Sequence, residues 1–281
     1  MAGERIRRPA VSGLFYEAEA SRLRRQVEWC FEHRYGPGRQ PGPAGQRRVR
    51  ALVVPHAALQ YSGPVAAHAY LRLAEAPPPA VIVIVGPDHY GHGSAVAVAP
   101  QARWATPLGE VETDHPVRDD LARRGLPADA RGHQREHSIE VQLPFLQVIG
   151  YHGPVVPIVM ADQQAETVGH LADLLVAVLA GIEAAMIAST DLSHYLPYEH
   201  AVDVDRVVLA ALMSGDGRRL LDDVRSQAIT MCGAGPAAAV LEASRRLGCG
   251  PVEVLRYATS GDIAGDRQAV VGYAAAALDA A

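Results

Sequence analysis

Four short apolar runs, set far apart in the chain, limit the possible fold more than any other sequence feature. They cover residues 51–54, 81–85, 155–160 and 184–188. Each is rich in β-branched residues or flanked by turn-forming residues. Continuous apolar runs of this length are typical of strands that are buried on both faces, as in parallel sheets.

Segments with helical periodicity separate most of these runs. They cover residues 18–34, 64–74, 165–180 and 201–213. Strands that alternate with helices predict an α/β fold with a central, mostly parallel or mixed sheet flanked by helices. Residues 94–99 and 108–112 are predicted to form a hairpin-type excursion, and residues 252–257 and 268–275 to form late, antiparallel strands.

A single domain is expected over residues 1–281. Residues 35–46 are rich in Pro, Gly and Arg, but the apolar pattern resumes soon after them, so we interpret them as a loop and not as a domain boundary. Chains of ~250 residues with an α/β pattern often form one domain. A chain of this length can bury a large core and still leave a cleft.

Composition and charge argue against several function classes. The net charge of −5 and the lack of an arginine-dense face give no reason to expect a nucleic acid partner. No apolar run reaches about 18 residues, so no membrane span is expected. Residues 1–9 lack the apolar stretch of a signal peptide. Three scattered cysteines are too few for a disulfide framework, and the expected location is therefore the cytoplasm.

Three of the predicted strands are followed by a histidine. His56 comes after the first run, His89 after the second and His194 after the fourth. Each lies among turn-forming residues, which fix the loop that aims a side chain. Binding sites of open α/β sheets form beyond the carboxyl ends of the strands. A lone histidine there is usually an ordinary loop residue, but three in the same position favour one shared cleft.

Cys232 is a candidate fourth member of this cleft. It lies shortly before a predicted helix over residues 237–247, with Pro236 suited to the first helical turn. The positive end of a helix dipole favours a thiolate, which is a strong ligand for iron, zinc or copper. The alternative is a small buried apolar residue, and we assign Cys30 and Cys249 to that alternative.

Five motifs occur in a fixed order and carry a family resemblance. They are Pro55-His56-Ala57, Gly86-Pro87-Asp88-His89-Tyr90, Glu136-His137-Ser138-Ile139-Glu140, Ser189-Thr190-Asp191-Leu192-Ser193-His194-Tyr195 and Met231-Cys232-Gly233. With them, nearly the whole chain resembles the Memo-like proteins, which in bacteria and archaea form component B of the AmmeMemoRadiSam gene set. That family is similar in fold to the LigB-type, class III extradiol dioxygenases. The resemblance also implies a functional association with AMMECR-like and radical-SAM proteins.

The resemblance implies a metal site. The related dioxygenases hold Fe(II) with two histidines and a glutamate, and a further histidine acts as acid and base. In Memo-like proteins a cysteine takes the place of the glutamate. Carried over by motif, the ligands here are His56, His89 and Cys232, while His194 takes the acid–base position with Asp191 beside it. The expected ion is Fe(II), with copper and zinc as alternatives.

Five further residues are predicted to line the substrate cleft. His137 and Glu140 lie three apart, on one face if their segment is helical; the alternative is a capping and surface pair. Glu140, like Asp191, is also a candidate to orient a metal-bound imidazole. Tyr61 and Tyr195 flank ligand motifs and are expected to contact a substrate. His92 is a candidate for the rim of the cleft, although its Gly-rich surroundings favour a solvent-exposed loop.

Three functions fit these residues. The first is a non-haem iron oxidoreductase that uses O2 on an unknown substrate, because three protein ligands leave coordination positions open. The second is a zinc-type hydrolase with an activated water. The third is a metal-handling or peptide-binding module without catalysis. A thiolate in place of the carboxylate departs from the dioxygenase pattern and exposes sulfur to oxidation, so catechol is not carried over as the substrate.

Overall fold

One eight-stranded sheet forms the centre of the computed structural model, which describes residues 6–281. Residues 1–5, part of the N-terminal segment considered above, lie outside the described residues. Four parallel strands stand side by side in the order β2, β8, β3, β7. They span Val49–Val54 (β2), Ala184–Ser189 (β8), Val81–Pro87 (β3) and Val155–Met160 (β7). The four apolar runs therefore form the parallel core of the sheet, as predicted.

Antiparallel strands extend this core on both sides. β4 (Val96–Val98) pairs with β7 at one edge. At the other edge β11 (Val270–Asp279) pairs with β2, and β10 (Glu253–Thr259) pairs with β11. The short strand β9 (His194–Leu196) also pairs with β11. The predicted late antiparallel strands are confirmed, and the sheet is mixed.

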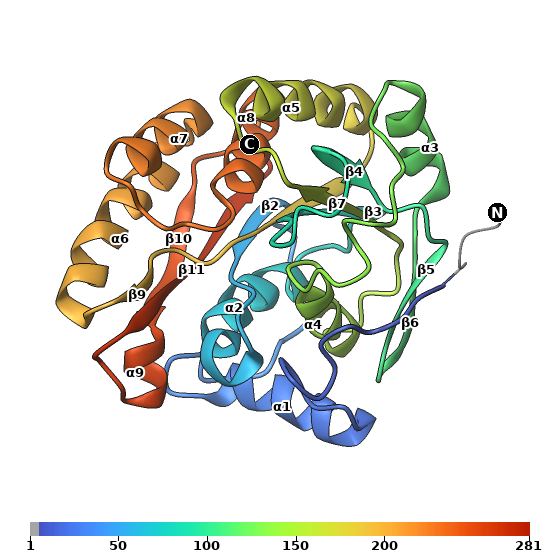
Figure 1. Cartoon of the computed structure of the whole chain (residues 1–281). Helices are drawn as coiled ribbons and strands as arrows, with labels where there is room; N and C mark the ends of the chain where they lie inside the picture. Colours follow the sequence, from blue (N-terminus) through green and yellow to red (C-terminus); the bar gives the residue numbers. More distant parts are fainter. Residues whose placement is uncertain (1–5) are drawn as a thin grey trace.

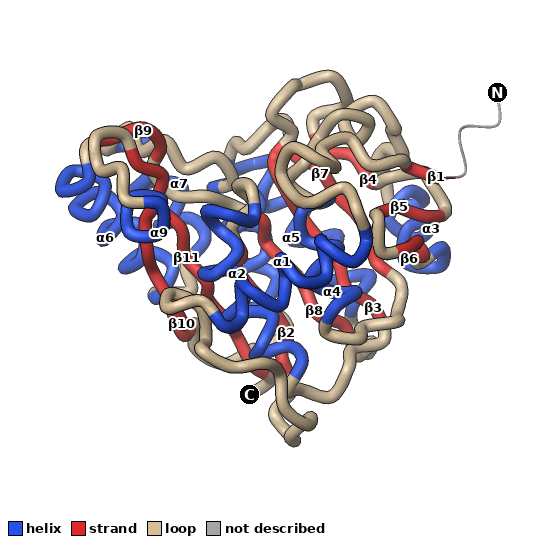
Figure 2. The backbone as a smooth tube through the Cα atoms, turned by 90° about the horizontal axis from the view of Figure 1, so that it is seen from below, coloured by secondary structure: helices blue, strands red, loops and turns tan. Residues whose placement is uncertain are grey.

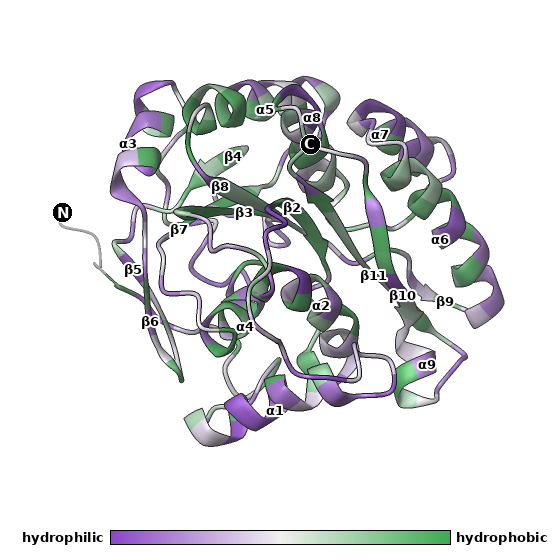
Figure 3. Cartoon of the chain, turned by 180° about the vertical axis from the view of Figure 1, so that it is seen from behind, coloured by the Kyte–Doolittle hydropathy of each residue, from purple (hydrophilic) through white to green (hydrophobic). Residues whose placement is uncertain are grey.

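Helices cover both faces of the sheet (Figures 1 and 2). One layer contains α1 (Ala20–Glu32), α2 (Leu59–Ala74) and α4 (Leu143–Val148). The other contains α3 (His115–Arg123), α5 (Ala165–Leu179), α6 (Tyr198–Met213), α7 (Gly217–Ser226) and α8 (Ala234–Arg246). Alternate residues of each strand face opposite layers, so Val83 packs in one core cluster and Ile84 in the other. The apolar strands are thus buried on both sides, while the outer helix faces are polar (Figure 3).

The predicted α/β fold is confirmed, but two local predictions need correction. Residues 94–99 and 108–112 do not pair with each other. β4 is fully buried and joins the main sheet, whereas β6 (Gly109–Glu112) pairs with β5 (Arg103–Thr106) across a two-residue turn. With β1 (Ile6–Arg7) these two strands form a separate small sheet. The short turn makes the local pairing the easier one to close.

Helix α2 begins five residues before its predicted start at Pro64. Proline suits a first helical turn, but here it lies inside the helix, where it costs one backbone hydrogen bond. Burial of the surrounding residues, from Ser62 to Ala67, compensates for that loss. The patterns also failed to predict α3, α4, α7 and the short helix α9 (Ser260–Ala264). No helix within residues 6–281 combines the length and apolar character needed to cross a bilayer.

Candidate metal centre

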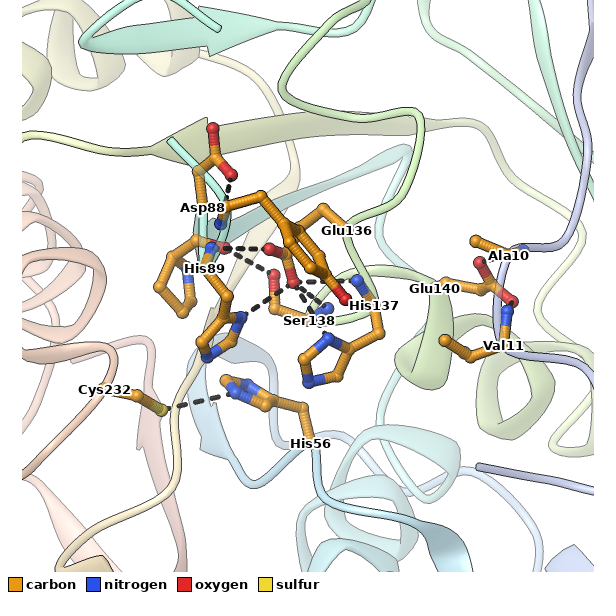
Figure 4. A network of polar contacts seen from close by, with 12 residues as sticks. Ala10, Val11, His56, Asp88, His89, Glu136, His137, Ser138, Glu140 and Cys232 are labelled. Carbon is orange, nitrogen blue, oxygen red and sulfur yellow. Dashed lines mark hydrogen bonds and ion pairs between the residues drawn. The ribbon is translucent and has the colours of Figure 1, made fainter. Parts of the chain in front are cut away.

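The carboxyl ends of the parallel strands β2, β3 and β8 lie at the same end of the sheet, and the candidate site lies just beyond them. His56 and His89 follow β2 and β3 by two residues each, and Cys232 reaches the same place from the turn before α8. The potential ligand atoms of these three residues all lie within 4.8 Å of one another. His56 Nε2 is 3.3 Å from Cys232 Sγ, with the ring of His89 beside them (Figure 4).

These distances fit a single ion. Zinc and similar ions bind imidazole nitrogen at about 2.0–2.1 Å and thiolate sulfur at about 2.3 Å. A nitrogen and a sulfur at such bond lengths and a tetrahedral angle lie ~3.6 Å apart. The His56–Cys232 pair, at 3.3 Å, is already close to this separation. His89 needs only a small movement of its ring, and its side chain, 29% exposed, has room for it.

Glu136 supports His89. Its Oε1 accepts a hydrogen bond from His89 Nδ1 at 2.9 Å, and its Oε2 accepts one from the His89 backbone N–H at 2.7 Å. The backbone N–H groups of His137 and Ser138 donate to Oε1 as well. Burial alone would raise the pKa of Glu136, but the hydrogen bond and charge of His89 outweigh it and hold the pKa at about 2. An ionised carboxylate therefore fixes a hydrogen on Nδ1 and turns Nε2 toward the cleft.

The same interaction acts on His89. Burial would lower the pKa of this imidazole, but the hydrogen bond and the negative charge of Glu136 raise it above its ordinary value. The group of His89, Glu136 and His137 also has the spacing of a metal site. Both oxygens of Glu136 already accept hydrogen bonds, however, so this group is a support for His89 and not a second centre.

His56 lies deeper, at 1% exposure. Its backbone N–H donates to Asp191 Oδ1 at 2.8 Å, and its Nδ1 lies 2.9 Å from Ser189 Oγ. Burial, and then the nearby rings of His137 and His89, hold the pKa of His56 well below its ordinary value. This candidate ligand is therefore a neutral imidazole.

Cys232 sits in the turn just before α8, which begins at Ala234, three residues earlier than predicted. Gly233 permits this turn, because a Cβ there would lie 2.6 Å from the Ser189 carbonyl oxygen. Burial, and then the charge of Asp191, raise the pKa of the Cys232 thiol. The prediction that the helix dipole stabilises a Cys232 thiolate is therefore wrong for the metal-free protein. Without a cation the sulfur keeps its proton, although the Asp191 backbone N–H donates to it at 3.2 Å.

His194 and Asp191 both line the cleft, but the structure shows no hydrogen bond between their side chains among the described residues. His194 Nδ1 lies 2.9 Å from the Leu192 carbonyl oxygen and 2.8 Å from that of Thr230. Both partners only accept, so Nδ1 carries the hydrogen and Nε2 has a free lone pair. Asp191 instead holds the backbone of His56, and burial raises its pKa.

The cleft has a volume of about 620 Å³. Besides the site residues, its walls are mostly aromatic or small, with Phe15, Tyr61, Tyr195 and Tyr273 contributing rings. His137 also lines it, stacked on His89 at 4.6 Å between ring centroids. Burial lowers the pKa of His137 to about 4, so the ring is neutral at pH 7. Tyr195 is 77% exposed and has a positive φ of 58°, a strained conformation that is common at functional sites.

Two predicted cleft residues lie elsewhere. Glu140 is fully buried and points away from the cleft, toward the N-terminal segment (Figure 4). It accepts hydrogen bonds from Tyr16 Oη at 2.5 Å and from the backbone of Ala10 and Val11, and it forms an ion pair with Arg7. Residues 140–142 form a 3-10 turn, which directs Glu140 and His137 to opposite sides. His92 lies on an exposed loop and does not line the cleft.

Four residues of the site had no role in the sequence analysis. Glu136 and Ser189 occur in the quoted motifs, but nothing in their spacing identifies them as partners of imidazoles. Phe15 and Tyr273 come from the two ends of the chain, and only folding brings them to the same cleft. The one available signal was adjacency in the sequence to His137, a predicted cleft residue, and it applies to Glu136 alone.

Comparison with known proteins gives a consistent result. A family model described as "Memo-like protein" matches residues 7–277. A MEMO1 family protein of Methanothermobacter thermautotrophicus is 43% identical over 273 residues, which cover 96% of this chain and 99% of that protein. One of Methanopyrus kandleri is 44% identical over 275 residues, covering 96% and 97%.

A solved structure shares the fold. The crystal structure of an uncharacterized protein from Escherichia coli K12 superimposes with a TM-score of 0.54, at 17% sequence identity. The match covers 82% of this chain and 99% of that one. At this identity the likeness concerns the fold alone.

Proposed function

This chain belongs to the Memo-like protein family, and on that premise we propose that it is a non-haem iron oxidoreductase that binds one Fe(II) ion through His56, His89 and Cys232. The observation that carries the proposal is the convergence of two imidazoles and one sulfur, with potential ligand atoms within 4.8 Å of one another. They come from three distant parts of the chain, and the parallel strand order brings them together.

The donor set suits a divalent transition metal. The carboxylate of Glu136 keeps a hydrogen on His89 Nδ1, His56 Nε2 lies 3.3 Å from the Cys232 sulfur, and the sulfur becomes a thiolate when a cation replaces its proton. Nitrogen and sulfur ligands favour iron, copper or zinc over magnesium or calcium. When bound, such an ion supplies Lewis acidity, a redox centre in the case of iron, and open coordination positions.

His194 is the proposed acid and base. Its ring is held at Nδ1 by two backbone carbonyls, so the lone pair of Nε2 is available to take a proton from a substrate in the cleft. Asp191 is a positioning residue, because its carboxylate holds the backbone of His56 and has no hydrogen bond to the ring of His194 in the described chain. His137 is neutral at pH 7 and can accept or donate a hydrogen bond to the substrate.

The walls of the cleft favour a small, uncharged substrate with an apolar or aromatic body. A volume of about 620 Å³ lies within the usual range for small-molecule sites, about 300–1,000 Å³. Within residues 6–281, no arginine or lysine lines the cleft, and its charged side chains are Asp191 and Asp266. An anionic group held away from the metal would find no arginine or lysine to pair with. A hydroxyl or carbonyl oxygen of an uncharged substrate could face the metal.

Anaerobic purification followed by metal analysis and O2-uptake screening tests the proposal. We expect about one iron per chain and O2 consumption that depends on a substrate. Replacement of the sulfur in Cys232→Ser should remove most of the metal while the fold persists. Cys249→Ser, at a partly buried cysteine far from the cleft, is the matched control and should keep its iron. Equal metal content in both variants would contradict the proposed ligand set.

The replacement of a carboxylate by Cys232 favours a second candidate, a metal-handling or peptide-binding module. A thiolate ligand makes the centre prone to oxidation, which suits binding better than repeated turnover with O2. Stable metal binding without turnover over a broad screen would favour this function. Zinc at the site together with hydrolysis of a carboxyl derivative would favour the hydrolase instead, since the same donors suit Zn²⁺.

A further inference from the structure

A buried chain of four hydrogen-bonded side chains ends at His56. Tyr70 Oη donates to Gln142 Oε1 at 2.6 Å, and Gln142 Nε2 donates to Ser189 Oγ at 2.8 Å. Ser189 Oγ in turn lies 2.9 Å from His56 Nδ1. All four residues are at most 1% exposed, so solvent does not compete for these groups. Every hydrogen in the chain can therefore be assigned from its partners.

The backbone carbonyl of Pro55 fixes the orientation of the Gln142 amide. It lies 3.0 Å from Gln142 Nε2 and can only accept a hydrogen bond. A flipped amide would place Oε1 against this carbonyl, with two acceptors facing each other. The NH2 group must therefore face Pro55, and its second hydrogen then points at Ser189 Oγ.

The backbone carbonyl of Ser138 fixes the hydroxyl of Ser189 in the same way. Ser189 Oγ lies 2.6 Å from this carbonyl oxygen, so the single hydroxyl hydrogen is donated there. Gln142 occupies one lone pair of Ser189 Oγ. What remains for His56 is the other lone pair, and Nδ1 must carry a hydrogen to use it.

We propose that Ser189, whose hydroxyl hydrogen is directed to the Ser138 carbonyl, is a positioning residue that holds His56 in the tautomer with hydrogen on Nδ1, so that the Nε2 lone pair points into the cleft. Gln142 supports Ser189 by donating to its Oγ. The two carbonyl groups set the direction of the hydrogen bonds, and Tyr70 only completes the amide's hydrogen bonding. The assignment itself needs no metal. Its benefit to metal binding rests on the proposed function, because a tautomer with hydrogen on Nε2 has no lone pair to offer an ion.

Long-range ¹H–¹⁵N correlation spectra of the metal-free, full-length protein test the assignment directly. We expect the His56 pattern of an imidazole with hydrogen on Nδ1. Ser189→Ala should give a mixture of tautomers or the opposite one. Gln142→Leu leaves the Ser138 carbonyl as acceptor of the Ser189 hydroxyl hydrogen and should keep the wild-type tautomer. Tyr70→Phe should keep the wild-type pattern, because both carbonyl groups remain. Ser244→Ala, at a fully buried serine without a hydrogen-bond partner, controls for the loss of a buried hydroxyl.

Zinc titration of the same variants provides the second measurement. Loss of an indirect support of a metal ligand usually lowers metal affinity about 10–100-fold. We expect this loss for Ser189→Ala, and less than about threefold for Ser244→Ala. Circular dichroism identifies any variant that fails to fold, and Ser189→Thr, which retains the hydroxyl, should restore both the tautomer and the affinity.

The outcomes separate this proposal from the proposed function. A wild-type His56 with hydrogen on Nε2, or a doubly protonated ring, overturns the proposal whatever the metal result. So does an unchanged His56 pattern in Ser189→Ala. The expected spectra in a protein that binds no metal would support the tautomer assignment and refute the metal site.

Discussion

The two histidines of the candidate centre are supported in different ways. Glu136, a charged group with several backbone donors, holds the ring of His89, whereas the ring of His56 contacts only a neutral support, Ser189, to which Gln142 donates. Both supports place the hydrogen on Nδ1. The charged support raises the pKa of its imidazole, while burial lowers that of His56. The same placement of the hydrogen is therefore reached with opposite effects on the basicity of the two rings.

Both supports come largely from one short segment, residues 136–142. Glu136 begins it and Gln142 ends it, and Glu140 between them is bound to the N-terminal Arg7. Arg7 also donates to the backbone carbonyls of His133 and Glu136. The two supports are therefore different in chemistry, but both depend on Arg7 as their anchor. A change at Arg7 should act on both supports, and a change at Glu136 on one alone.

Loss of the anchor should have the largest effect. Arg7→Ala leaves Glu140 as a buried charge without its partner, and breaking such a pair costs about 3–5 kcal/mol. We expect this decrease in the free energy of unfolding by urea denaturation, together with weaker metal binding because both supports shift. Arg103→Ala, which removes an exposed ion pair on the neighbouring strand β5, should cost at most about 1 kcal/mol. Similar losses in the two variants would show that the anchor is unimportant.

Acid should weaken the same region through His133. Burial lowers the pKa of this imidazole to about 4, from an ordinary value of 6.5. Between these values the unfolded chain binds the proton and the folded chain does not, so stability is full above pH 6.5 and falls as the pH drops toward 4. At about 1.4 kcal/mol per pKa unit, the contribution is about 3 kcal/mol.

Urea denaturation of the metal-free protein at several pH values measures this effect. His133→Gln should flatten the decline between pH 6.5 and 4, because the amide does not titrate. His115→Gln replaces an exposed histidine and should leave the slope unchanged. An equal slope in wild type and His133→Gln would argue against a buried neutral imidazole.

Glu136→Gln should separate the two supports at a smaller cost. The amide NH2 would face a backbone donor, and an unsatisfied buried group costs about 1–3 kcal/mol. We expect zinc affinity to fall about 10–100-fold. The pKa of the His89 imidazole should also fall, because the negative charge of Glu136 is lost, while the tautomer of His56 is unaffected. NMR of the metal-free variant checks this. A joint change of both rings would show that the two supports are coupled and would contradict the inference that His56 and His89 are supported separately.

Local patterns in the chain were sufficient to predict most of the fold. Apolar runs without polar alternation identified the four parallel strands, and helical periodicity located α1, α5 and, apart from its first three residues, α6. The pairing of β4 with β7 was missed, because pairing depends on contacts between distant segments and not on the period of either strand. The short helices α7 and α9 were missed as well.

Sequence alone also placed His56, His89 and His194 after strand ends and Cys232 before a helix, since turn residues and strand lengths are local properties. Only the tertiary structure decided what supports them. Glu140 was predicted at the cleft, yet a single turn directs it to Arg7 while Gln142, two residues later, faces His56 through Ser189. The direction of a side chain within a short turn depends on what packs around it, and those neighbours come from the whole length of the chain.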